Sequence, residues 1–140
     1  MPPFLTTQRL DGSKPTHRPA VDYLKRAAAD GVKRAEIFFD PQQHCFTDTS
    51  GAGAGPNRDP KGIGQPKLPF KEVVLDGLCR AIDEAKAALG IDASLVLCFL
   101  QDRSTEEAMA MLEMALPYKE KILAVGMDNG VDQAGARTLE

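Results

Sequence analysis

Three aspartates in this 140-residue chain stand where acidic side chains could do chemistry. Asp40, Asp102 and Asp128 lie at or just beyond the ends of apolar runs, in AEIFFD, SLVLCFLQD and KILAVGMD. If these runs are parallel strands, their carboxyl ends form the edge where α/β proteins bind ligands. Carboxylates there can bind a metal ion, act as bases or anchor a polar ligand. Each one also has a purely structural explanation, because aspartate favours turns by bonding nearby backbone amides.

His44 follows Asp40 by four residues and directly precedes Cys45. A Cys/His nucleophilic pair would have to form across the fold, because adjacent side chains usually diverge. His17 is the other histidine, and neither HxH nor HExxH occurs in the sequence. A zinc site would therefore need carboxylates or thiols as further ligands. His44 remains a candidate ligand-binding residue, and we assign no catalytic residue and no metal ligand.

The segment GAGAGPNRDPKG does not match a phosphate-binding loop. A P-loop requires a glycine-lysine pair, which the sequence lacks, and a dinucleotide fingerprint places its glycines between a strand and the helix that follows. This segment is separated from the preceding strand and from the following helix, so we interpret it as a flexible linker or insertion.

The elements that would position these residues follow from the hydrophobic periodicity. Residues 20–30, 70–89 and 105–116 have helical spacing, while 33–40, 94–100 and 121–128 are short apolar runs typical of buried strands. Gly31 and Gly90 fit helix C-caps, and Ser104 with Glu107 fits a capping box. Residues 42–69 are rich in glycine and proline, which argues against a regular element there. The methionines of the last helix have the spacing of core residues (Met109, Met111 and Met114).

Strands alternating with helices predict an α/β fold with a parallel βαβαβ sheet and covering helices. Three strands cannot close a barrel, which takes about eight, so the sheet is either small and open or part of a larger one. Residues 1–19, polar and proline-containing, are expected to form a disordered arm, and residues 20–128 one domain with an insertion at about 46–67. Residues 129–140 form a C-terminal tail.

The composition argues against nucleic acids and membranes as partners. A net charge of -3 gives no reason to expect nucleic acid or an anionic membrane. The apolar runs are far shorter than the roughly 20 residues that span a bilayer. Three cysteines without CxxC spacing favour reduced thiols in a cytoplasmic protein.

These segments resemble the adenosine/adenine deaminase family, particularly its bacterial and fungal members. The resemblance rests on YLKRAAADGVKRAEIFFDPQQH, LPFKEVVLDGLCRAIDEAKAALGI and LVLCFLQDRSTEEAMAMLEMALPYKEKILAVGMD, which cover roughly residues 20–44 and 68–128. It implies part of a (β/α)₈ TIM barrel, about the second to fourth strands. It also implies a zinc-dependent hydrolase that displaces ammonia from the six-position of a purine base or nucleoside, with Asp40, His44, Asp102 and Asp128 on the rim facing the purine.

The departures from the family pattern are equally specific. The family's first strand supplies an HxH zinc pair, and no such pair occurs here. None of the family's metal ligands or acid/base residues has a match in this chain. The family's purine-contacting glycine after the fourth strand falls by position on Val131, with Gly130 adjacent. We therefore expect a truncated relative that binds no zinc and is inactive alone.

Two other hypotheses stay open. One is a non-catalytic partial barrel that acts by binding or by self-association through unpaired sheet edges. The other is a small α/β domain that holds a Mg²⁺-type ion with Asp40, Asp102 and Asp128, because this ion prefers oxygen ligands.

Overall fold

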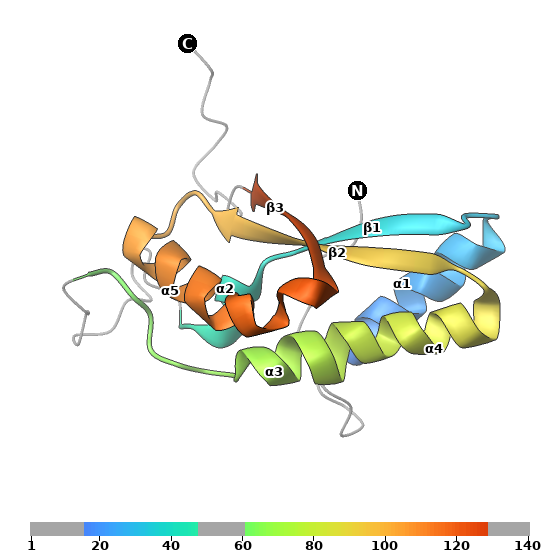
Figure 1. Ribbon diagram of the computed structural model, residues 1–140, viewed down its shortest axis with the longest axis horizontal. Coiled ribbons are helices and arrows are strands. Elements are labelled where there is room, and N and C mark those ends of the chain that lie inside the picture. The colour runs from blue at the N-terminus through green and yellow to red at the C-terminus, as the bar shows by residue number, and fades with distance from the viewer. Residues whose placement is uncertain (1–15, 48–60, 129–140) are drawn as a thin grey trace, which may run out of the picture.

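The computed structural model describes residues 16–47 and 61–128, which form a three-stranded parallel sheet and its helices (Figure 1). The strands β1 (Arg34–Phe39), β2 (Asp92–Leu100) and β3 (Ile122–Asp128) are hydrogen-bonded in the order β1-β2-β3. This confirms the predicted α/β class and the parallel sheet. The first helix, α1 (His17–Ala29), includes the boundary expected between residues 19 and 20, and residues 1–15 of the expected arm lie outside the described ranges.

The longest helical rod joins β1 to β2 and consists of three consecutive segments. These are α3 (Phe70–Val73), the π-helical segment η2 (Val74–Cys79) and α4 (Arg80–Leu89). Gly90 ends the rod with a φ of 65°, a conformation that glycine adopts without steric cost. The rod thus spans the predicted 70–89 helix.

The second crossover consists of α5 (Thr105–Ala115) and the 3₁₀ segment η3 (Leu116–Lys121). Ser104 caps α5, because its hydroxyl accepts a hydrogen bond of 3.1 Å from the backbone N–H of Glu107. The side chain of Glu107 does not close the predicted capping box and has other partners, described below.

A π-helical turn marks the contact between α1 and the rod. Thr16 donates a buried hydrogen bond of 2.6 Å from its hydroxyl to the carbonyl of Val73, at the start of the π segment. A side chain at Gly77 would overlap that hydroxyl, so the close approach requires glycine at this position. The irregular turn therefore accommodates a contact between residues far apart in the sequence.

The main core lies on one side of the sheet, where Figure 1 shows α1, α4 and α5 gathered. Phe39, Leu95 and Leu97 of the strands are buried there against apolar residues of the helical segments (Phe70, Val73, Val74, Leu78 and Met111). A smaller cluster of Leu24, Ala27, Ala85 and Ile91 joins α1 to α4.

Three sequence predictions about local structure and burial were wrong. Residues Pro41–Cys45 form a short helix, α2, within a stretch expected to be irregular, because Pro41 at its first turn fixes a helical φ. The strand predicted to be buried at 121–128 is largely exposed, since among the described residues β3 has a neighbouring strand on one side only. Of the methionines, Met111 is buried, whereas Met109 and Met114 face outward.

Within residues 16–47 and 61–128, no helix has the length and apolar composition needed to cross a bilayer.

Candidate functional site

The carboxyl ends of β1, β2 and β3 meet at one edge of the parallel sheet, which we call the carboxyl rim. Asp40 follows β1 directly, and Asp128 ends β3 in register with Leu100. The rim is therefore the place where the three strands bring sequence-distant polar groups together.

Asp40 and Asp128 approach each other across the end of β2. Burial, and secondarily the charge of Asp128, raises the pKa of the Asp40 carboxyl from 3.8 to about 6. Burial raises the pKa of the Cys98 thiol to about 11, with smaller contributions from Asp40 and Asp128. The structure thus brings Asp40 and Asp128 close enough to influence each other, and the thiol of Cys98 lies near both.

Asp40 carries a buried oxygen, Oδ1, for which the described residues provide no hydrogen-bond partner. Asp40 stands at the N-cap of α2, but its side chain does not cap that helix. A buried polar atom without a partner costs free energy, so this oxygen is a candidate for a contact with a bound molecule. With a pKa of about 6, this carboxyl can either donate or accept a hydrogen bond near neutral pH.

His44 lies in α2 and is likewise half-buried. Its Nδ1 atom is buried and has no hydrogen-bond partner within the described part of the chain. Burial, and then the charge of Lys67, lowers the pKa of the imidazole, so it is neutral at physiological pH. Cys45 beside it is not a nucleophile, because burial raises the pKa of its thiol to about 11.

Of the other two predicted residues, only Asp102 lies in the described part of the chain. Asp102 is exposed in the turn after β2. Backbone hydrogen bonds hold this turn: the amide of Arg103 donates to the Leu100 carbonyl at 3.2 Å, and the amide of Gln101 donates to the Asp128 carbonyl at 3.0 Å. Gly130 lies outside the described residues.

No cluster that fits a metal ion forms at the rim. Across residues 16–47 and 61–128, no group of three or more His, Cys, Asp or Glu side chains converges in a way that could hold one. The described residues thus do not fit the zinc site implied by the family, nor the magnesium site considered for the three aspartates.

Sequence reasoning missed a buried polar network next to the rim. Gln42 and Glu107 are fully buried, and the Gln42 amide nitrogen donates to Glu107 Oε1 at 3.0 Å. Gln42 Oε1 accepts a 2.8 Å hydrogen bond from the Leu100 amide at the end of β2. No local signal pointed to this contact, because Gln42 lies in a stretch expected to be irregular and Glu107 fits the first turn of a helix.

Comparison with known proteins places these observations in a family. The model of the adenosine deaminase protein family matches residues 6–139 of this chain. The adenine deaminase of Geotalea uraniireducens is 46% identical over 107 residues, which cover 76% of this chain and 24% of that protein. The adenine deaminase of Cupriavidus metallidurans is 40% identical over 109 residues, covering 78% and 25%. The chain thus spans about a quarter of the length of the curated relatives it matches.

Solved structures agree on the fold. The crystal structure of adenine deaminase from Arthrobacter aurescens superposes with a TM-score of 0.59 at 28% identity, covering 80% of this chain and 28% of that one. An amidohydrolase from Burkholderia ambifaria, solved with bound Zn, superposes with a TM-score of 0.62 at 20% identity, covering 84% and 29%.

Proposed function

Because this chain belongs to the adenosine deaminase family, we propose that its carboxyl rim forms one part of a purine site in a hydrolase that deaminates adenine. Both relatives described above are named for adenine, which favours the free base over the nucleoside. The observation that carries the proposal is two buried polar atoms without a described partner, Asp40 Oδ1 at the end of β1 and His44 Nδ1 in the helix α2 that follows.

The chemistry of a purine fits this pair. A purine presents ring nitrogens that accept hydrogen bonds and, in adenine, an amino group that donates them. Asp40, with a pKa of about 6, can donate to a ring nitrogen when protonated and accept from an amino group when ionised. Burial, and secondarily the charge of Asp128 on the same rim, keeps part of the Asp40 population protonated near neutral pH. These residues bind and orient the base; none is assigned to the chemical step.

We propose further that the isolated 140-residue polypeptide does not deaminate adenine. The resemblance implies that zinc would supply an activated water, and the described residues do not assemble a set of ligands for it.

The polypeptide is expected to act in the cytoplasm, consistent with its three unpaired cysteines. It is also expected to self-associate through the exposed strand β3.

A segment exchange tests the proposal. Residues 20–128 of this chain replace the matching stretch of the Geotalea uraniireducens enzyme, and the chimera is assayed for ammonia release from adenine and for bound zinc. We expect the chimera to deaminate adenine and the 140-residue chain to release none. A folded, zinc-loaded chimera without activity would contradict the proposed role of the rim. Ammonia release by the chain alone, with stoichiometric zinc, would contradict its expected inactivity.

A further inference from the structure

The polar network beside the rim is organised around one carboxylate. Glu107 is fully buried at the start of α5 and accepts three hydrogen bonds from three different segments. Gln42 of α2 and Arg103 donate to its Oε1 at 3.0 and 2.6 Å, and the backbone amide of Gly64 donates to its Oε2 at 2.7 Å. Three donors onto one buried carboxylate provide the compensation that a charge needs away from water.

One part of this network holds α2, the helix that follows Asp40. Gln42 sits in α2 between Asp40 and His44, and its amide oxygen holds the backbone of Leu100 at 2.8 Å. The same side chain therefore ties α2 both to the end of β2 and, through Glu107, to α5. These two hydrogen bonds fix the side chain that lies between Asp40 and His44 in the sequence.

A second part of the network holds residues 45–47 against residues 64–67. These two segments run antiparallel with one isolated bridge between Phe46 and Pro66, and we call them the neck. Gly64 is held by Glu107, and Arg103 donates from its Nη2 to the carbonyl of Thr47 at 2.7 Å. A side chain at Gly64 would overlap the Thr47 carbonyl, which shows how closely the two sides of the neck approach.

The neck also reaches the rim directly. Lys67 donates from its ammonium group to the carbonyl of Gln43 at 3.0 Å, and its charge is one cause of the lowered pKa of His44. Displacement of the neck would therefore move the charge of Lys67 relative to the imidazole of His44.

Stability alone does not require a buried ion pair at this place. Well-packed apolar residues of similar volume often replace such a pair without loss of stability, because they avoid the cost of removing two charges from water. What an apolar pair cannot reproduce is directional bonding to Gln42, Gly64 and Thr47. We propose that Glu107, held by Arg103, is a positioning residue for the carboxyl rim: it fixes α2 through Gln42 and keeps the two segments of the neck in contact. The inference rests on the proposed function only for the meaning of the rim as a purine site.

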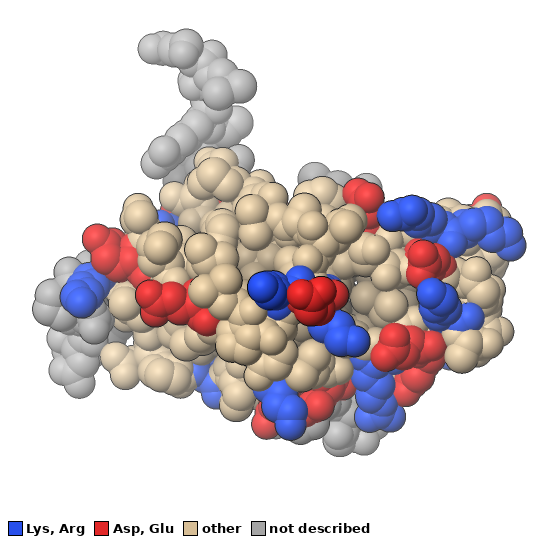
Figure 2. All heavy atoms as spheres, in the orientation of Figure 1, with Lys and Arg blue, Asp and Glu red and all other residues tan. Residues whose placement is uncertain are grey.

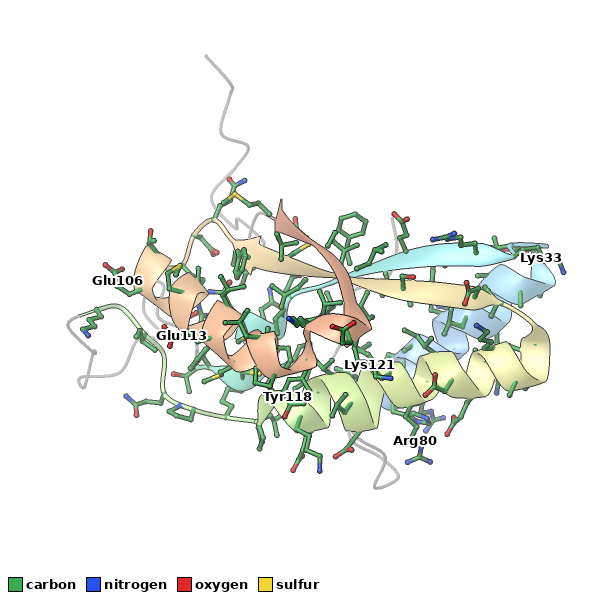
Figure 3. The ribbon with its side chains drawn as sticks, viewed as in Figure 1. Lys33, Arg80, Glu106, Glu113, Tyr118 and Lys121 are labelled. Carbon is green, nitrogen blue, oxygen red and sulfur yellow. The ribbon has the colours of Figure 1, made fainter. Side chains whose placement is uncertain are left out.

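The two histidines of the chain provide the test. His44 reports on α2, while His17 is bonded to Glu84 at 2.8 Å on the rod and serves as an internal control. The pKa of both imidazoles is measured by NMR titration of the full 140-residue chain. Two variants break the network differently: Gln42→Met removes the bridge and keeps the ion pair, and Arg103→Met with Glu107→Met replaces the pair by apolar side chains. Glu106→Gln is the matched control, because Glu106 points outward from the start of α5 (Figure 3).

In both network variants we expect the pKa of His44 to rise toward its ordinary value of 6.5, because α2 loosens and water reaches the ring. The pKa of His17 should stay unchanged, and Glu106→Gln should leave both histidines unchanged. Folded network variants with an unaltered His44 titration would overturn the inference. So would the unfolding of both variants, because Glu107 would then be needed for stability rather than for position. Failure of the segment exchange to give activity would leave this titration result unaffected, so the two proposals fail separately.

Discussion

At the scale of single residues, the rim combines an acid that is easy to protonate with a histidine that is hard to protonate. Burial is the first cause in both cases, since it disfavours the charged form of each group. The charges of Asp128 and Lys67 act in the same directions. The rim is thus less charged than its residue types suggest, which suits a flat, neutral base better than a free metal ion.

Asp40 gives the fold a specific dependence on pH. Its pKa is raised in the folded state to about 6, so the folded protein binds the proton more tightly than the unfolded chain does. Its contribution to stability is therefore fully present below pH 3.8 and is lost as the pH rises through 6. Asp40→Asn, which cannot ionise, should raise the melting temperature relative to the parent chain at pH 7.5 and change it little at pH 3.5.

The exposed Asp22→Asn variant is the control for this measurement, because Asp22 lies on the outer side of α1. An Asp40→Asn variant that lowers the melting temperature at pH 7.5 would show that the ionised carboxyl is stabilised rather than penalised in the folded protein.

At the scale of elements, the fit of α1 against the rod depends on Thr16 and Gly77. Gly77→Ala places a methyl group on the Thr16 hydroxyl, and overpacking of this kind typically costs about 1–3 kcal/mol of unfolding free energy. Thr16→Ala alone loses the hydrogen bond to Val73. Because the two residues share one space, the double variant should lose less than the sum of the single losses in a urea-unfolding cycle. Strict additivity would show that the two residues do not compete for this space.

The predictability of the elements follows from the range of the interactions that define them. The three strands and three long helices were predictable because hydrophobic periodicity and capping residues such as Gly90 act locally. The helix α2 is too short for periodicity to reveal. The π turn depends on Thr16, which lies 57 residues before its partner, and the Gln42–Glu107 contact spans 65 residues. The meeting of Asp40 with Asp128 could be predicted only because parallel topology places all strand ends at one edge.

At the scale of the whole molecule, β3 exposes a surface that the described residues do not cover. Leu123, Val125 and Met127 are 54%, 60% and 68% exposed, and Val125 lies in register with Leu97, on the side of the sheet that the helices cover elsewhere. Figure 2 shows an uncharged surface over the outer part of β3 and a group of charged side chains near the start of the strand. An apolar edge strand of this kind can pair with another strand.

Self-association through this surface should depend on protein concentration. In analytical ultracentrifugation we expect the 140-residue chain to associate as its concentration rises, and Val125→Lys to weaken association by placing a charge in the apolar edge. Val32→Lys, a substitution far from β3 between α1 and β1, should have no such effect. Equal association of both variants would exclude β3 as the contact surface.

The account as a whole depends on whether the rim contacts the purine. The most direct test is kcat/KM for adenine in the segment-exchange chimera carrying Asp40→Ala, His44→Ala or, as a control, Asp22→Ala. Loss of a hydrogen bond to the base costs about 1–3 kcal/mol, so each rim variant should lower kcat/KM by about 5- to 150-fold while the control leaves it unchanged. Rim variants that fold, bind zinc and deaminate adenine as fast as the unsubstituted chimera would contradict the account.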